Sequence, residues 1–82
     1  MIEITVKLFA ALRQEAGWSE KRITLPAGST VGQLIILLAS REGLALTGRA
    51  IYTAVNQEYA QPDKVLQAGD VAAVFPPVSG GR

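Results

Sequence analysis

The sequence predicts an α+β fold in which a mixed β-sheet carries one main helix on one face. Apolar and polar residues alternate over residues 2–8, an apolar stripe with helical spacing follows Thr30, and residues 71–75 form an apolar run. A helix of this kind buries its stripe only against another element, and a sheet needs one face covered. Because the first and last strands are the most apolar, we expect them to be parallel neighbours at the sheet centre, with the helix as their crossover.

The first quarter of the chain predicts two strands around a short helical turn. Residues 2–8 are the first strand, with its apolar side chains on one face. Residues 10–16 are good helix formers, and Gly17 ends this turn. A second strand covers residues 19–25 and closes at the Pro26-Ala27-Gly28 turn. Two strands joined so closely should be antiparallel.

The main helix is predicted to begin after Thr30. Thr30 and Gln33 have the spacing of a capping box, in which each side chain bonds to the other residue's backbone N–H. Gly43 marks the end of the helix. Ile36 and Leu37 widen the apolar stripe, which indicates either a partner surface or deep burial against the sheet, and we favour burial. The stripe itself consists of Val31, Leu34, Ile35, Leu38 and Leu37.

The second half of the chain predicts three further strands. Residues 51–55 form a strand that turns at Asn56-Gln57 into a short return strand over residues 58–60. After the Ala68-Gly69-Asp70 turn, residues 71–75 form a last strand in the middle of the sheet, an apolar run typical of strands with both faces occupied. With a single main helix, however, the second face of the sheet has no cover within the chain. This order of elements is that of the β-grasp.

Side-chain alternation in the last strand decides which of its residues lie on the sheet face away from the helix. If Ala72 and Val74 point toward the helix, then Val71, Ala73 and Phe75 point away from it. Five consecutive apolar residues are equally compatible with the opposite orientation. In the first case an exposed aromatic ring lies beside the C-terminal segment and suggests a docking surface.

Composition narrows the classes of function. The chain has 82 residues, enough for one domain, and its formal net charge of +1 argues against a nucleic-acid binder. The longest apolar run is only residues 34–39, and charges interrupt the N-terminal segment, so we expect no membrane span, no signal peptide and a cytoplasmic location. There is no Cys and no His, which removes the commonest nucleophile, general base and metal ligands. Catalysis by this chain's own side chains and a metal site are therefore not expected.

The C-terminal segment is the best candidate for the part of the chain that takes part in chemistry. Gly80 and Gly81 follow a rigid Pro76-Pro77 pair. Because glycine has no Cβ, such an end can enter a narrow channel and bring a carboxylate to a partner's reactive groups. The simpler alternative is a frayed chain end without a role.

Several segments resemble one family. Residues 69–81 match a Gly-Asp turn that leads through an apolar strand to a Phe-Pro-Pro-Val-Ser-Gly-Gly tail, and this pattern is similar to the C-terminal signature of the small subunit of molybdopterin synthase. Residues 6–10, 13–17 and 54–57 resemble the first strand, the short helix and the internal hairpin of that family. The resemblance covers the whole chain and implies a ubiquitin-like β-grasp domain at residues 1–82, with residues 76–82 as a flexible tail.

The resemblance implies a sulfur carrier that donates sulfur without being a catalyst itself. An adenylyltransferase related to ubiquitin-activating enzymes would use Mg-ATP on the Gly81 carboxylate, and a sulfur donor enzyme would convert it to a thiocarboxylate. The tail would then enter the large subunit of molybdopterin synthase, with which the chain would form a heterotetramer, and sulfur would pass to a cyclic pterin precursor. This chain would bind no cofactor or metal of its own. The residues expected to contact the partner are Phe75, Pro76, Pro77, Val78, Ser79 and Gly80.

Arg82 departs from the family pattern, in which the active form ends at the second glycine. A long cationic side chain beyond Gly81 should weaken or prevent activation. Three explanations stay open: a peptidase removes Arg82, the activating enzyme tolerates it, or the chain has left the sulfur pathway.

Three other functions are compatible with the sequence. A sulfur carrier for thiamine or tRNA thiolation would share the fold and the terminus, although Phe75-Pro76-Pro77-Val78 argues against the thiamine carrier. A protein modifier would form isopeptide bonds through Gly81 instead. An interaction domain with an inert tail accounts for Arg82 but not for the rest of the motif.

Overall fold

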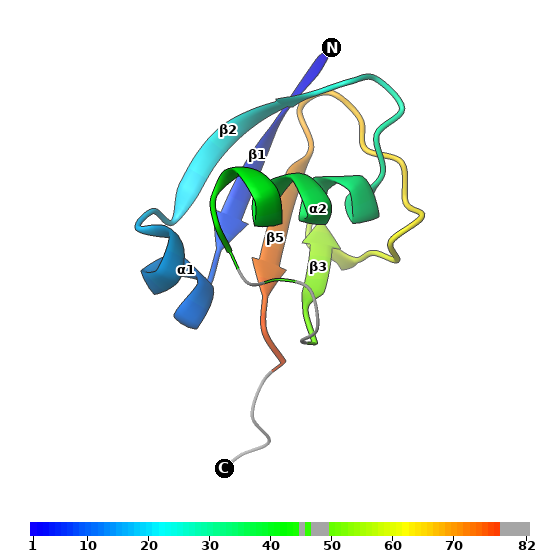
Figure 1. Cartoon of the computed structure of the whole chain (residues 1–82). Coiled ribbons are helices and arrows are strands. Elements are labelled where there is room, and N and C mark those ends of the chain that lie inside the picture. Colours follow the sequence, from blue (N-terminus) through cyan, green and yellow to red (C-terminus); the bar gives the residue numbers. More distant parts are fainter. Residues whose placement is uncertain (45, 47–49, 78–82) are drawn as a thin grey trace.

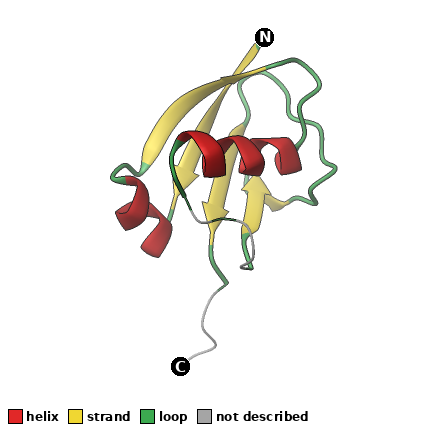
Figure 2. Cartoon of the chain, viewed as in Figure 1, coloured by secondary structure: helices red, strands yellow, loops and turns green. Residues whose placement is uncertain are grey.

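The computed structural model describes residues 1–44, 46 and 50–77. Within these residues the predicted order of elements is confirmed, and Figures 1 and 2 show the strands as one twisted layer with a helix lying across it. The elements are β1 (Ile2–Leu8), α1 (Ala11–Ala16), β2 (Glu20–Leu25), α2 (Val31–Arg41), β3 (Tyr52–Val55), β4 (Glu58–Tyr59) and β5 (Val71–Phe75).

The sheet has the strand order β2-β1-β5-β3-β4. As predicted, β1 and β5 are parallel neighbours at its centre, with Val6 opposite Ala72 and Leu8 opposite Val74. The β1–β2 pair is antiparallel, as expected for strands joined so closely, and β3 is antiparallel to both β4 and β5. Helix α2 lies between β1 and β5 in the sequence and crosses one face of the sheet (Figure 1).

The core lies between this face and α2, and it settles the orientation of β5. Ala72 and Val74 are fully buried on the helix side, whereas Val71, Ala73 and Phe75 are only partly buried. Of the two orientations that the sequence left open, the structure has the one in which Phe75 points away from the helix. No described element covers the face opposite α2, as expected for a sheet with one main helix, so the apolar run of β5 is covered by the chain on one face only. The largest fully buried side chains are Ile4, Leu8, Leu12, Leu25, Leu34, Leu38 and Leu66.

The start of α2 is held by its capping box and by a close approach of the chain at Pro62. Thr30 Oγ1 accepts from the Gln33 N–H at 3.3 Å, and Gln33 Oε1 accepts from the Thr30 N–H at 2.8 Å. The Gly32 N–H donates to the Pro62 carbonyl at 2.9 Å. A Cβ on Gly32 would stand 3.3 Å from that same oxygen, which is tighter than most Cβ contacts, so glycine lets the two segments approach without a shift of the Pro62 carbonyl.

The burial predicted for the widened stripe of α2 is wrong for Ile36. Its side chain is 64% exposed, while Leu37 packs partly buried against the core. The sheet lies on one side of the helix only, so the buried positions are Val31, Leu34 and Leu38, which share one face. Ile36 projects away from that face.

Small shifts in the predicted ends have local causes. Helix α1 begins at Ala11, because Ala10 has φ 56° and ψ −134°, outside the helical region. Gly17 ends α1 in the left-handed conformation, as predicted. The return strand β4 stops at Tyr59, one residue early. No helix in the described part of the chain is long and apolar enough to cross a membrane.

Candidate functional site

The predicted tail begins where β5 ends. Pro76 and Pro77 directly follow Phe75 outside any strand, as expected for residues that cannot continue a ladder of backbone hydrogen bonds. Beside them, the Phe9 N–H at the end of β1 donates to the Val74 carbonyl at 3.3 Å. The other predicted tail residues, Val78, Ser79, Gly80 and Gly81, and the following Arg82 lie outside the described residues.

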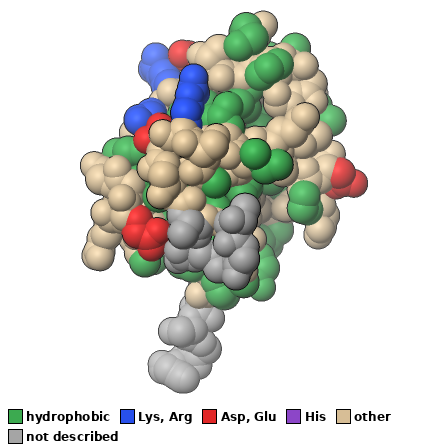
Figure 3. All heavy atoms as spheres, in the orientation of Figure 1, with side chains coloured by type: hydrophobic (Ala, Val, Ile, Leu, Met, Phe, Trp, Pro, Cys, Tyr) green, Lys and Arg blue, Asp and Glu red, His purple; other side chains and the backbone are tan. Residues whose placement is uncertain are grey.

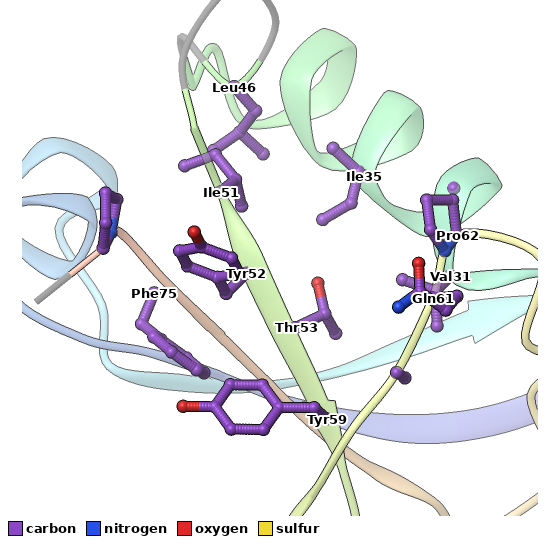
Figure 4. Close-up of a pocket in the computed structure, with 13 residues that line it drawn as sticks. Val31, Ile35, Leu46, Ile51, Tyr52, Thr53, Tyr59, Gln61, Pro62 and Phe75 are labelled. Atoms are coloured by element: carbon purple, nitrogen blue, oxygen red, sulfur yellow. The ribbon is translucent and has the colours of Figure 1, made fainter.

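Three aromatic rings gather around the end of β5, and we call Tyr52, Tyr59 and Phe75 the aromatic cluster. Tyr52 stands directly opposite Phe75 in the β3–β5 pair. Ring centroids are 6.1 Å apart for Tyr52–Phe75, 6.0 Å for Tyr59–Phe75 and 6.5 Å for Tyr52–Tyr59. These separations are typical of aromatic pairs that stabilise one another. Figure 4 shows the three rings side by side.

The cluster is largely open to solvent. Tyr52 is 47% exposed and Tyr59 is 79% exposed. Because side chains alternate along each strand, the cluster lies on the sheet face opposite α2, together with Ala54 and Ala73. The β1–β2 half of the same face is polar. Its residues, assigned by the strand register, are Glu3, Thr5, Lys7, Glu20, Arg22 and Thr24.

An exposed apolar patch bounded by polar residues is typical of a protein-binding surface. Tyr59 and Tyr52 present rings with polar tips, which suits a surface that is wet when free and covered when bound. The sequence interpretation found Phe75 but missed both tyrosines. The signal was available in the predicted hairpin, because Tyr52 and Tyr59 share a sheet face with Ala54 once the turn at residues 56–57 is fixed.

The start of β5 is held by a network of hydrogen bonds around Asp70. Its carboxylate accepts from the Asn56 side-chain amide at 3.0 Å and from the Gln67 N–H at 2.8 Å. Asn56 Oδ1 accepts from the Val71 N–H at 3.0 Å, and the Asn56 N–H donates to the Val71 carbonyl at 2.8 Å. Asp70 is only 8% exposed. The Gly-Asp turn of the tail signature thus joins the β3–β4 hairpin to β5.

A separate polar cluster ties the start of β2 to the end of α2. The Trp18 indole N–H donates to Glu42 Oε1 at 3.1 Å, and Lys21 Nζ lies 3.2 Å from both carboxylate oxygens. Lys21 Nζ also stands 4.9 Å from the Trp18 ring centroid. The hydrogen bond from Trp18, then the bond from Lys21, lowers the pKa of Glu42 below its ordinary 4.5. Among the described residues, the acidic side chains form no group that could hold a metal ion.

Together, the sheet with its crossing helix, the aromatic cluster and the Pro-Pro start of the tail define a ubiquitin-like β-grasp protein. Residues 6–81 match the model of the ThiS family, and the chain belongs to that family. It is 32% identical to the molybdopterin synthase sulfur carrier subunit of Arabidopsis thaliana, over 98% of this chain and 84% of that protein. The predicted resemblance to the small subunit of molybdopterin synthase is thereby confirmed.

Solved structures agree with this assignment. A Pyrococcus furiosus protein described as molybdopterin converting factor subunit 1 has a TM-score of 0.86 and 35% identity, covering 95% of this chain and all of that one. Small archaeal modifier protein 1 of Haloferax volcanii has a TM-score of 0.83 and 29% identity over the same shares. Subunit 1 in a complex of subunits 1 and 2 of molybdopterin-converting factor from Helicobacter pylori shares the fold, with a TM-score of 0.71 and 23% identity over 98% of this chain and 100% of that one.

Proposed function

We propose that this chain carries sulfur for molybdopterin synthesis as a thiocarboxylate on Gly81. The observation that carries this proposal is the position of the aromatic cluster, which lies directly before the first residues of the tail. Gly81 follows Phe75 by six residues, so a partner that covers Phe75 can receive Gly81 up to about 20 Å inside its own structure. The family relatives named as molybdopterin synthase sulfur carrier subunits support the same function.

The chemistry requires an activated carboxylate. A carboxylate is a poor acceptor for a sulfur nucleophile, and adenylation with Mg-ATP gives it a leaving group, AMP. We propose that an adenylyltransferase related to ubiquitin-activating enzymes carries out this step and that a separate sulfur donor enzyme supplies the sulfur. With no cysteine of its own, the chain holds transferable sulfur without competing thiols.

The proposed recipient is the large subunit of molybdopterin synthase, paired with this chain in a heterotetramer in the cytoplasm. The Helicobacter pylori complex of subunits 1 and 2 supports this kind of partner. We assign the aromatic cluster as the docking surface and Pro76-Pro77 as a rigid exit that lowers the entropy lost on insertion. Val78 and Ser79 would contact the walls of the partner's channel. Gly80, which has no side chain, would fit a narrow part of that channel.

Arg82 must be removed for this chemistry. The Gly81 carboxylate is free only after hydrolysis of the Gly81–Arg82 peptide bond, whatever else follows Arg82. We propose that a peptidase carries out this hydrolysis before activation.

Reconstitution tests the function. A chain that ends at Gly81 as a thiocarboxylate is mixed with the large subunit and the cyclic pterin precursor, and molybdopterin is measured. We expect product in proportion to the carrier added and none from the chain that ends at Arg82. Failure of the thiocarboxylate form to yield product with an active large subunit would refute the proposed function.

Protein modification is the second candidate, and the similarity to small archaeal modifier protein 1 favours it. A modifier would appear on denaturing gels as covalent adducts that vanish when Gly80 and Gly81 are deleted. A thiamine or tRNA thiolation carrier would instead donate sulfur to the corresponding acceptor enzyme and leave the pterin precursor unchanged.

A further inference from the structure

A cleft of about 750 Å³ runs from α2 around the outer edge of β3 to the aromatic cluster on the other face of the sheet. Its walls are mainly apolar, with Val31 and Ile35 from α2 on one side and Ile51 on the other (Figure 4). At one end the cleft reaches Phe75 and Pro77, where the tail begins. In Figure 3, which shows the α2 side, hydrophobic side chains are prominent on the β3 side, whereas Lys and Arg gather on the β2 side.

Part of the edge of β3 beside this cleft has no neighbouring strand among the described residues. The short strand β4 pairs only with Ala54 and Val55. One further bond, from the Ala60 N–H to the Thr53 carbonyl at 2.9 Å, ends the pairing on this side within the described residues. Because backbone groups point to alternate sides of a strand, those of Ile51 point to the same edge as those of Thr53. Since the Thr53 carbonyl is already bonded to Ala60, the backbone groups left for another strand are those of Ile51 and the Thr53 N–H.

Thr53 places a hydroxyl in the cleft. The residue is only 6% exposed, and within the part of the chain that the structure describes its hydroxyl bonds to no protein group, but the oxygen itself is not sealed from water. Figure 4 shows this hydroxyl directed into the space between β3 and α2. Water can serve as the partner of this hydroxyl in the free protein, and a segment that fills the cleft would displace that water and leave the hydroxyl in need of another partner. The hydroxyl is therefore available to a polar group that enters the cleft from outside.

We propose that an extended segment of the large subunit of molybdopterin synthase adds to the edge of β3 and places one apolar side chain in the cleft. Its backbone would pair with Ile51 and with the Thr53 N–H, and a polar atom of the segment would bond to the Thr53 hydroxyl. Strand addition of this kind draws affinity from backbone hydrogen bonds and specificity from a side-chain pocket. The segment belongs to the protein that takes the tail, because the cleft is continuous with Phe75 and Pro77. This pairing presupposes the sulfur-carrier function proposed above.

Amide hydrogen exchange tests the pairing directly. The chain ending at Gly81 is measured alone and in complex with the purified large subunit, and exchange is resolved by NMR. We expect the Ile51 and Thr53 amides to exchange at least about tenfold more slowly in the complex. Amides on the outer edge of β2 serve as the control and should not change.

Thr53→Val tests the hydroxyl, with Thr24→Val on exposed β2 as the matched control. Loss of one hydrogen bond predicts a Kd for the large subunit about threefold to tenfold higher in Thr53→Val. The free variant should be at least as stable as the wild type, because the hydroxyl has no protein partner to lose. Thr24→Val should leave the Kd unchanged. A Thr53→Val variant with unaltered Kd, or one that is less stable when free, would overturn the role of the hydroxyl.

The outcomes separate this inference from the proposed function. If the wild type does not bind the large subunit, both fail. If it binds and transfers sulfur but the β3-edge amides stay unprotected, only the strand addition fails. If those amides become protected in the free protein as its concentration rises, the occupant is a second copy of this chain and the inference is wrong.

Discussion

The two ends of β5 differ in their surroundings: polar side chains bond to one another at its start, and aromatic rings face solvent at its end. At the start of the strand, Asp70 and Asn56 bond to one another and to backbone groups, and Asp70 is almost completely buried. At the other end, Phe75 lies among the exposed rings of Tyr52 and Tyr59, directly before the tail. The polar groups at the first end find their hydrogen-bond partners within the chain, whereas the aromatic rings at the second end stay open to solvent and available to a partner.

This difference shows how one strand serves both stability and binding. Asp70 and Asn56 fix the register of β5 at one end, so its other end can leave apolar rings exposed without losing its position. Exposed apolar surface of this kind is favourable only when something covers it. A substitution at the exposed end should therefore mainly weaken binding, and a substitution at the buried end should mainly destabilise the fold.

The largest effect is expected at the exposed end. Phe75→Ala removes the central ring of the aromatic cluster, and an aromatic residue at the centre of an interface typically contributes about 2 kcal/mol or more, roughly 30-fold in Kd. We expect this weakening toward the large subunit in isothermal titration calorimetry. The stability of the free chain should fall by only about 1 kcal/mol, because the side chain is half-buried.

Ile36→Ala is the matched control for Phe75→Ala. Ile36 is also an exposed apolar residue, but it lies on α2 outside the aromatic cluster. Its truncation should leave the Kd unchanged. An equal loss of affinity in both variants would mean that exposed hydrophobicity in general, not the cluster, drives binding.

The second effect is expected at the buried end. Asp70→Ala leaves the Gln67 N–H and the Asn56 amide without their acceptor, and we expect a loss of about 1 to 3 kcal/mol in the free energy of unfolding. Urea denaturation measures this loss, and the exposed Asp63→Ala serves as the control. Affinity of the folded fraction for the large subunit should not change. A stable Asp70→Ala variant with weakened binding would reverse the assigned roles.

The smallest effect concerns Glu42, which lies in neither region. Its pKa is lowered in the folded protein by Trp18 and Lys21, so its contribution to stability is complete above the ordinary value of 4.5 and is lost as the pH falls through the folded pKa. Thermal denaturation should show Glu42→Gln slightly less stable than the wild type at pH 7. This difference should shrink below pH 4.5. A constant difference across that range would exclude the charged pair as its cause.

Much of the fold could be predicted because local signals agreed with one another. The alternation in residues 2–8, the capping box at Thr30 and the turn at Asn56-Gln57 each act within a few residues, and the structure contains all three. Ile36 was misjudged because helical periodicity alone does not show how wide a face the sheet covers.

The candidate site was predictable only in part. The tail motif pointed to Phe75, but the aromatic cluster depends on the pairing of three strands, which no local pattern encodes. The same is true of the bonds from Trp18 and Lys21 to Glu42, which join residues more than 20 positions apart. The unpaired edge of β3 became visible only with the length of β4.

The intact mass of this protein, purified from its own cells while the cofactor is being made, tests most directly whether Gly81 carries sulfur. We predict a species that ends at Gly81 with one carboxylate oxygen replaced by sulfur, alongside the unsulfurated form that ends at the same residue. If the chain persists with Arg82 attached and without sulfur under these conditions, Gly81 is not the sulfur-bearing residue and the proposed function is contradicted.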